Sequence, residues 1–232
     1  MTPTSPLSES LKNETRDLHT QAERSAFMQV LLRGKMDRTA YGAMLRNLHA
    51  IYAAMESVLA RHAHDPLLAP LVLPGLPREA ALRHDLDALF GNAWHRAYAL
   101  EPAAQRYVAR LQAIEEARPG LLAAHSYVRY LGDLSGGQIL ARIVRESMGL
   151  PAGEGTAFYA FGDAAATAHL RKAYRAGLAV LRPDDATRRA IVDEARLAFE
   201  LHCALFDELA QAYLQPALAL GGGPLGIAPS RP

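Results

Sequence analysis

The sequence predicts a single all-α domain, a helical bundle, and three observations support that fold class. Apolar residues recur at helical spacing along most of the chain, and half of the 232 residues are hydrophobic. No segment alternates convincingly between apolar and polar residues, because the best strand candidate, residues 71–73, is short and lies between prolines. The chain can therefore bury a sizeable core built from helices alone.

The predicted helices follow one another from the first residues to residue 213. The first begins near Pro6, a suitable N1 residue, with Ser5 as its N-cap. The second covers residues 37–63, and Asp37 can cap it. Prolines and glycines separate the later helices, which are predicted at 78–90, 102–117, 120–149, 167–181 and 184–213.

Composition excludes several classes of protein. No linker divides residues 1–215, which are predicted to form one domain, whereas residues 216–232 are rich in glycine and proline and are predicted to be a disordered tail. The formal net charge of +1 gives no uniform basic field, so nucleic acid is not expected as a partner. Neither a signal peptide nor 18 consecutive uncharged apolar residues are found, so no membrane partner is expected.

The cysteine content predicts the compartment. Cys203 is the only cysteine, so an intrachain disulfide or a paired-cysteine metal site cannot form. A reducing compartment is favoured, and a cytoplasmic location is predicted.

Four residues with ionisable side chains share one face of the first predicted helix. Lys12, Arg16, His19 and Glu23 are spaced by four, three and four residues. Glu23 can accept the Nδ1 proton of His19 and leave Nε2 free, as metal-bound imidazoles usually require. Lys12 and Arg16, roughly 10 and 5 Å away by helical rise, would suit an anionic group near the metal. For this helix alone, a solvated face with charge pairs is the simpler alternative.

The stretch YVRYLGDLSGGQIL at 127–140 combines an apolar helical pattern with three central glycines. Each costs about 1 kcal/mol relative to alanine in a helix interior, so their presence needs a reason. Gly132 and Gly136 are four residues apart and leave a patch of bare backbone, which Gly137 widens, and the cluster permits a kink. A flat ligand pressed against the backbone is one reason. Helix packing, a C-cap and a hinge are the alternatives.

Asp133 lies between these glycines and forms an i,i+4 pair with Arg129, while Tyr127 and Tyr130 bring hydroxyl groups nearby. A carboxylate that Arg129 keeps ionised is a candidate for proton handling. A simple intrahelical ion pair is the alternative. The residues alone therefore predict a flat-ligand pocket with one imidazole and one carboxylate, and they specify no reaction.

Six segments match one known family in the same order along the chain: 11–28, 49–57, 106–112, 125–140, 149–161 and 199–209. The motifs LHTQAE and LGDLSGGQ within them are the most specific. By these segments the sequence resembles the heme oxygenases, most closely the mammalian-type and related bacterial members, over nearly all of residues 7–213. The resemblance implies a helical domain that holds heme between a proximal helix and a kinked, glycine-rich distal helix.

The resemblance also implies a role for individual positions. His19 is similar to the proximal iron ligand, with Glu23 supporting it, and Asp133 to the distal aspartate that organises water near the iron. Gly132 and Gly136 match the glycines whose backbone lies over the heme. The remaining matches are Tyr52, Tyr127 and Arg129 in a hydrogen-bond network, Lys12, Arg16, Arg171 and Arg175 at the heme propionates, and Phe199 and Phe206 in the pocket wall.

The reaction implied by the resemblance uses heme as cofactor and as substrate. Dioxygen cleaves the porphyrin at a meso carbon, and the products are biliverdin, ferrous iron and carbon monoxide. The implied partners are an electron donor, either a ferredoxin or an NADPH-dependent reductase, and, as a further candidate, a bilin-accepting protein. The alternatives are a non-catalytic heme carrier or sensor on the same scaffold and a helical protein without cofactor, but the presence of Asp133 and its glycines favours the enzyme.

The sequence departs from the mammalian-type pattern at one position and at its C-terminal end. His202 stands between Phe199 and Phe206, where that pattern has asparagine, and it is the rival iron ligand to His19. Cys203 beside it is expected to be a buried neutral thiol. The C-terminal membrane anchor of the mammalian members has no counterpart, as expected for a soluble bacterial enzyme.

Overall fold

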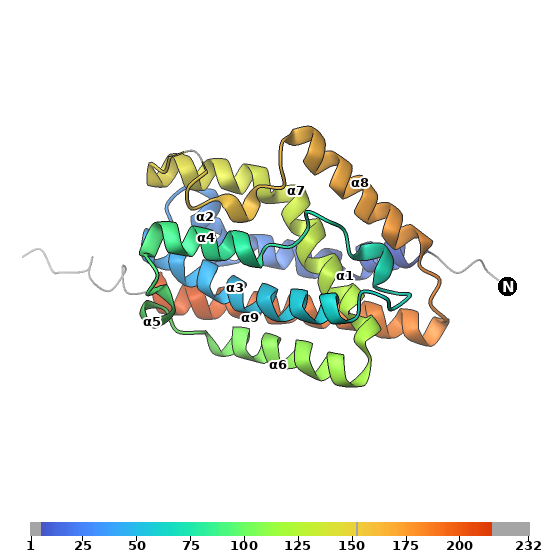
Figure 1. Ribbon diagram of the computed structural model, residues 1–232. Helices are drawn as coiled ribbons and strands as arrows, with labels where there is room; N and C mark the ends of the chain where they lie inside the picture. Colours follow the sequence, from blue (N-terminus) through green and yellow to red (C-terminus); the bar gives the residue numbers. More distant parts are fainter. Residues whose placement is uncertain (1–5, 152, 215–232) are drawn as a thin grey trace, which may run out of the picture.

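The structure, a computed structural model, describes residues 6–151 and 153–214. Within these ranges the chain forms α-helices and short 3₁₀ turns and contains no strand (Figure 1). The α-helices are α1 (Leu7–Arg24), α2 (Ala26–Leu32), α3 (Arg38–Arg61), α4 (Glu79–Phe90), α5 (Trp94–Ala97), α6 (Pro102–Ala117), α7 (Leu122–Met148), α8 (Ala164–Val180) and α9 (Asp185–Tyr213), and the 3₁₀ turns are η1 (Ala69–Leu71), η2 (Pro119–Leu121) and η3 (Ala157–Tyr159).

The all-α prediction is confirmed, and the predicted helices correspond to α1, α3, α4, α6, α7, α8 and α9. Asp37 caps α3 as expected, because its Oδ1 accepts a hydrogen bond of 2.8 Å from the backbone N–H of Ala40. Pro6 occupies the N-cap of α1 rather than N1, and both the predicted cap Ser5 and the predicted tail 216–232 lie outside the described residues.

The sequence did not predict α2 or α5. Both are short, and α2 is separated from α1 only by Ser25, whose ψ of 148° interrupts the helix. The hydroxyl of Ser25 then accepts a hydrogen bond from the N–H of Met28 and starts the new helix in another direction.

The core lies where α1, α3, α6 and α7 meet the long helix α9. Figure 1 shows α3 and α9 side by side across the middle of the molecule, with α6 below them and α7 crossing above. The rings of Phe27 and Phe206 stack with centroids 5.8 Å apart and join α2 to α9. Since Tyr41, Tyr52 and Tyr107 are also fully buried, large aromatic side chains fill much of this core.

Helix α7 changes direction along its length, between its yellow-green first half and its yellow end (Figure 1). Beside it runs η3, which Asp85 of α4 holds in place by accepting hydrogen bonds of 2.8 Å from the N–H groups of Ala157 and Phe158. A Cβ added to Gly137 would lie 3.4 Å from the carbonyl oxygen of Tyr159. The third glycine of the predicted patch lines the cleft beside Gly136 and also contacts η3.

The position of α8 also depends on one glycine. A Cβ added to Gly177 would lie 2.1 Å from the carbonyl oxygen of Pro70, so α8 can approach η1 this closely only without a side chain at that point. The hydroxyl of Tyr174 meets that of Ser126 at 2.8 Å and ties α8 to α7. These contacts fix the helix that carries Arg175.

A buried polar cluster joins α6, α7 and α9. Glu194 accepts hydrogen bonds from Arg110 at 2.9 and 2.5 Å and from Nε2 of His125 at 3.0 Å. The Tyr107 hydroxyl donates to Nδ1 of His125 at 3.1 Å, which completes the partners of the imidazole. Burial by itself would raise the pKa of Glu194, but the hydrogen bonds from Arg110 and His125 lower it to about 2.

This cluster makes stability depend on pH in a defined direction. The folded pKa of Glu194, about 2, lies below its ordinary value of 4.5, so its contribution is present above about pH 4.5 and is lost as the pH falls toward 2. The shift corresponds to on the order of 3 kcal/mol. We expect Glu194→Gln to lower the free energy of unfolding by about that amount at pH 7, and the gap to the parent should narrow between about pH 5 and pH 3.

Urea denaturation followed by circular dichroism at several pH values measures both proteins. Glu200→Gln, a change of an exposed carboxylate on α9, is the matched control and should leave the free energy of unfolding nearly unchanged. A gap for Glu194→Gln that stays constant across this pH range would contradict the assignment.

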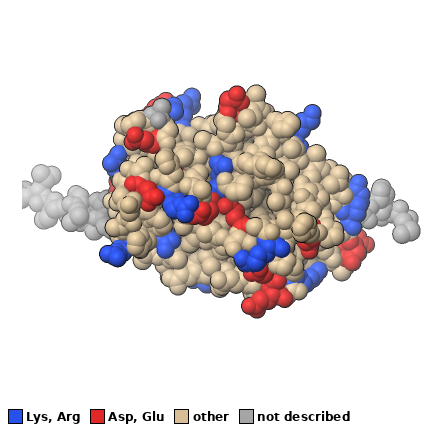
Figure 2. All heavy atoms as spheres, viewed as in Figure 1, with Lys and Arg blue, Asp and Glu red and all other residues tan. Residues whose placement is uncertain are grey.

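The surface shows no single-sign field on the face drawn in Figure 2, where Lys and Arg are interspersed with Asp and Glu. Among the described helices, none combines the length and the apolar character that crossing a bilayer requires.

Candidate active site

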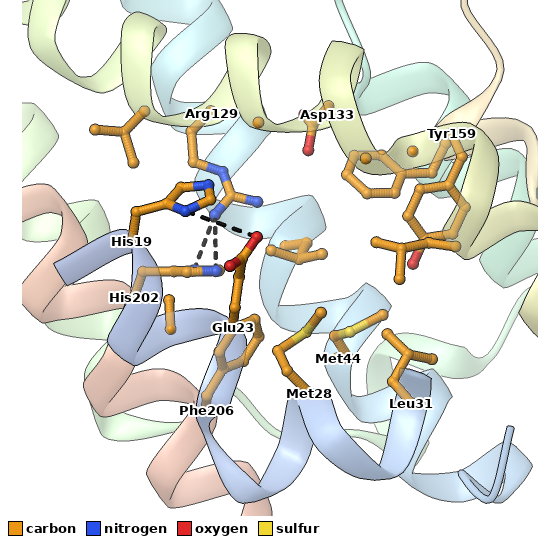
Figure 3. A pocket seen from close by; sticks show the side chains of 18 of the residues that line it. His19, Glu23, Met28, Leu31, Met44, Arg129, Asp133, Tyr159, His202 and Phe206 are labelled. Carbon is orange, nitrogen blue, oxygen red and sulfur yellow. Dashed lines mark hydrogen bonds and ion pairs between the residues drawn. The ribbon is translucent and has the colours of Figure 1, made fainter. Parts of the chain in front are cut away.

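A cleft opens between α1 and α7, with α9 as its side wall and η3 at its inner end (Figure 3). The cavity volume is about 170 Å³ in the inner region of the cleft and about 770 Å³ in its outer region. The two regions meet at residues that line both, namely His19, Val128, Gly132 and Phe199. The outer region alone lies in the range of roughly 300 to 1,000 Å³ that small-molecule sites occupy.

The outer region of the cleft is basic. Lys12 and Arg16 of α1 line one side, and Arg175 of α8 lines the other. Tyr127 and Ser135 of α7 add hydroxyl groups between them. This arrangement can bind the anionic groups of a ligand whose apolar body lies deeper in the cleft.

His19 lies at the junction of the two regions. Its Nδ1 is 3.7 Å from Oε1 of Glu23, one helical turn further along α1, as the sequence spacing predicted. This distance suits an ion pair but is longer than a hydrogen bond. Phe199 of α9 packs edge-on against the imidazole with ring centroids 5.9 Å apart. With Nδ1 facing Glu23, Nε2 is the nitrogen available to a metal.

The glycines of α7 form the opposite wall. A Cβ added to Gly132 or Gly136 would meet no atom within 4 Å, so these two positions face open space in the cleft. No contact with another described residue therefore requires a glycine at either position. A flat ligand lying against the helix backbone is the explanation that the geometry supports.

Asp133 lies between these two glycines, and a hydrogen-bond chain runs behind it. The Tyr52 hydroxyl donates a short hydrogen bond to Oδ2 of Asp133 and accepts one of 3.2 Å from Nε of Arg129. The guanidinium also lies over the Tyr52 ring, 5.1 Å from its centroid. Arg129 and Asp133 are thus joined through Tyr52, and the alternative of a simple intrahelical ion pair does not describe this geometry.

The pKa of Asp133 is shifted in the direction opposite to the one that a pairing with Arg129 alone would give. Burial raises its pKa above the ordinary value, and the opposing effects of Arg129 and the Tyr52 hydroxyl do not reverse this direction. Asp133 therefore holds a proton more tightly than an exposed aspartate does. A carboxyl group of this kind is better suited to deliver a proton than one that Arg129 keeps fully ionised.

His202 of α9 lies beside the same network. The Nη1 of Arg129 is 2.9 Å from Nδ1 of His202 and 3.4 Å from Nε2 (Figure 3). The imidazole packs on Phe206 with ring centroids 4.1 Å apart. The side chains of His202 and Phe206 both line the inner region of the cleft.

The structure brings most of the predicted site residues to one cleft. Two of them are not among the lining residues. Tyr52 lies behind the α7 wall of the cleft and reaches Asp133 through its hydroxyl group. Arg171 lies on α8, one turn before Arg175. The predicted residues that line the cleft are Lys12, Arg16, His19, Glu23, Tyr127, Arg129, Gly132, Asp133, Gly136, Arg175, Phe199 and Phe206.

Sequence reasoning missed the inner end of the cleft. Phe158 and Tyr159 of η3 line it, together with Met28 and Met44. The position of η3 depends on its hydrogen bonds to Asp85, about 70 residues away along the chain. No local pattern could have shown this contact.

The open space at Gly132 leads to a two-sided prediction. Gly132→Ala should stabilise the apoprotein by about 1 kcal/mol, because alanine favours a helix and its methyl group meets nothing. Gly132→Leu should lower the affinity for the flat ligand at least tenfold, because its side chain occupies the cleft. Thermal unfolding and ligand titration measure the two effects.

The control is Gly137→Ala, which places a methyl group against Tyr159 instead of into the cleft and should not stabilise the protein. Ligand affinity that is unchanged in Gly132→Leu would exclude contact between the ligand and this stretch of the backbone.

Comparison with known proteins gives a consistent result. A family profile described as heme oxygenase matches residues 5–208. Human heme oxygenase 1 is 40% identical over 205 residues, covering 88% of this chain and 71% of the human protein. Heme oxygenase 1 of Nostoc sp. is 39% identical over 205 residues, covering 88% of this chain and 86% of its own.

Solved structures are similar as well. Heme oxygenase-2 from Synechocystis sp. in complex with heme and NO superimposes with a TM-score of 0.86 at 36% identity, covering 91% of this chain and 88% of that chain. Heme oxygenase-1 from the same cyanobacterium in complex with heme superimposes with a TM-score of 0.86 at 35% identity. This match covers 94% of this chain and 98% of that chain.

Proposed function

Because the chain belongs to the heme oxygenase family, and is thus an enzyme with heme as substrate and cofactor, we propose that heme binds in the cleft between α1 and α7. There dioxygen would cleave the ring at a meso carbon, using electrons from a ferredoxin or an NADPH-dependent reductase. The products would be biliverdin, ferrous iron and carbon monoxide. The observation that carries the proposal is the bare backbone at Gly132 and Gly136 opposite an imidazole with a free Nε2.

The residues of the cleft fit heme in charge and in shape. His19 would bind the iron through Nε2, and one imidazole is sufficient because the porphyrin supplies four nitrogen ligands of its own. Lys12, Arg16 and Arg175 at the cleft mouth would bind the two propionates. Arg171 stays a further candidate for this role, since it lies one turn from Arg175 on α8.

When bound, heme supplies the iron that activates dioxygen and the carbon ring that is oxidised. The protein contributes space and protons. The absence of side chains at Gly132 and Gly136 would leave room in the cleft for heme and for dioxygen. Asp133 has Oδ2 engaged by Tyr52, so its Oδ1 is available to hold a water molecule in the cleft and to exchange a proton with it. Arg129 keeps Tyr52 in place, and Tyr127 offers a further hydroxyl group at the cleft wall.

The function can be tested with the purified protein, hemin, NADPH and either a ferredoxin system or a reductase. We expect a Soret band on addition of hemin, followed by biliverdin in the product chromatogram and carbon monoxide in the headspace. A heme carrier or sensor would give the Soret band and no biliverdin. A helical protein without cofactor would give neither.

A further inference from the structure

A chain of five aromatic rings runs from the inner end of the cleft to α8. It begins at Tyr159 and Phe158 of η3, whose ring centroids are 4.9 Å apart and which both line the inner region. It continues from Phe158 to Tyr52 at 5.5 Å and from there to Tyr130 at 6.1 Å, and Tyr174 of α8 follows at 6.5 Å. All of these separations lie within the range of roughly 4.5 to 7 Å that is typical of aromatic contacts. The rings therefore form a continuous path for an electron between the cleft and the protein interior.

Water is excluded from this chain, because each of its members is at most 4% exposed. A tyrosine that loses an electron also loses its hydroxyl proton, since the oxidised phenol is a strong acid. Without water, this proton needs an acceptor within hydrogen-bond distance. The hydroxyl groups of Tyr159 and Tyr174 pair with other hydroxyl groups, which are weak bases. Those of Tyr52 and Tyr130 donate to carboxyl groups and therefore have a suitable acceptor.

Charge distinguishes these two tyrosines. Nε of Arg129 donates to the Tyr52 oxygen at 3.2 Å, and the guanidinium lies 5.1 Å from the centroid of the same ring. This positive charge opposes the removal of an electron from Tyr52. The hydroxyl of Tyr130 donates to Oε1 of Glu56 at 3.0 Å, and the negative charge of a carboxylate favours the removal of an electron from the ring beside it. Tyr130 is therefore the member of the chain that is most readily oxidised.

Glu56 is held in place to receive the proton. Its Oε1 also accepts a hydrogen bond of 2.5 Å from the N–H of Arg78, and its Oε2 accepts one of 3.1 Å from the N–H of Glu79. These partners are donors, as an ionised carboxylate requires. Burial raises the pKa of Glu56 above its ordinary value, although the same hydrogen bonds oppose the shift. Glu56 therefore takes up a proton more readily than an exposed glutamate does.

We propose that Tyr130 is a redox-active residue, which returns an electron to heme oxidised by a peroxide and passes its hydroxyl proton to Glu56. The electron reaches the cleft through Tyr52 and Phe158. Such a residue protects a protein that activates oxygen beside its own heme. The proposal rests on the proposed function, because it requires heme in the cleft.

The electrons and protons of this step balance. A peroxide ROOH takes up two electrons and two protons, its O–O bond breaks, and ROH and water are formed. When bound heme supplies both electrons, Tyr130 returns one of them: its O–H bond breaks, the electron moves to the heme, and the proton binds to Oε1 of Glu56. A two-electron reductant such as ascorbate then gives one electron to the heme and one to Tyr130, which regains its proton from Glu56, and releases the two protons that the peroxide took up.

Two substitutions test the two partners separately. Tyr130→Phe keeps the ring and the aromatic chain but has no hydroxyl group to oxidise. Glu56→Gln keeps an oxygen acceptor for the N–H groups at the start of α4 but is a much weaker base. Tyr98→Phe is the matched control, because Tyr98 is also a buried tyrosine, but it stacks on Phe90, outside the chain.

The first readout is electron paramagnetic resonance of the heme-loaded protein, frozen shortly after it is mixed with peracetic acid. We expect a tyrosyl radical in the parent and in Tyr98→Phe, identified by the narrower signal of protein with ring-deuterated tyrosine. The splitting by the β-protons depends on the side-chain torsion, so it distinguishes one tyrosine from another. The signal with the parental splitting should be at least tenfold weaker in Tyr130→Phe and in Glu56→Gln. The same signal at parental strength in Tyr130→Phe would overturn the proposal.

The second readout tests the proton transfer in the parent itself, so it does not depend on how well a variant folds. After exchange into ²H₂O, the radical oxygen should carry a hydrogen bond from the deuterated carboxyl group of Glu56. Electron–nuclear double resonance should detect it as a deuterium coupling. A radical without this coupling, or an undiminished signal in Glu56→Gln, would exclude Glu56 as the proton acceptor.

The heme complex itself separates this proposal from the proposed function. Absence of a Soret band on addition of hemin would overturn both. A normal Soret band and biliverdin formation, without a tyrosyl radical after peracetic acid, would overturn the role of Tyr130 and leave the proposed function intact.

Discussion

Replacing His19 by alanine should abolish the normal heme complex. The variant should bind hemin weakly or with a shifted Soret band, because His19 is the only histidine among the described residues that lines both regions of the cleft. We expect turnover to fall about 100-fold, which corresponds to about 2.7 kcal/mol at 1.36 kcal/mol per factor of ten. Absorption spectroscopy and the rate of biliverdin formation measure these effects.

Added imidazole provides a control within the same experiment. It should enter the space left by the side chain, bind the iron and restore much of the turnover. His169→Ala should behave as the parent, since His169 lies outside the cleft. An unchanged Soret band in His19→Ala would assign the iron to His202, which lines the inner region of the cleft.

Replacing Asp133 should separate heme binding from heme cleavage. Asp133→Ala should keep the Soret band, because the iron ligand and the basic mouth of the cleft are untouched. Biliverdin formation should fall by about 10² to 10⁴-fold, the usual contribution of a positioned proton donor. Since the proton is then no longer delivered through Asp133, we expect the variant to oxidise added phenols in a peroxidase-like reaction instead of cleaving its own heme.

The conservative variant tests the role of the carboxyl group. Asp133→Asn keeps the size of the side chain and an acceptor for Tyr52, but it cannot exchange a proton, so it should be as inactive as Asp133→Ala. Asp207→Asn, a change of an exposed carboxylate on α9, is the matched control. Biliverdin formation at the parental rate in Asp133→Asn would exclude Asp133 from proton delivery.

Both predictions depend on geometry that the sequence suggested only incompletely. The spacing of His19 and Glu23 along one helix correctly predicted that the two side chains face each other, because residues four apart lie on the same face. The same rule places Arg129 and Asp133 on one face of α7, but it does not show how the two side chains are connected. Tyr52, 77 residues before Arg129, lies between them and engages both.

The three glycines of α7 also show what helical spacing can and cannot predict. Their spacing predicted a bare patch of backbone, and Gly132 and Gly136 do face open space. Gly137 lines the same cleft, but η3 covers the position that its Cβ would take. The helix period indicates which residues share a face, but it does not indicate which distant segment covers that face.

The sequence by itself determined the all-α class, the approximate bounds of seven helices and, through its motifs, the resemblance to the heme oxygenases. Helical periodicity and capping are local properties, so they can be read from neighbouring residues. Only the tertiary structure decided that Asp85 anchors the inner wall, that Tyr52 bridges Arg129 and Asp133, and that His202 faces Arg129. Each of these contacts joins residues more than 70 positions apart, and the packing of helices, rather than any local preference, brings them together.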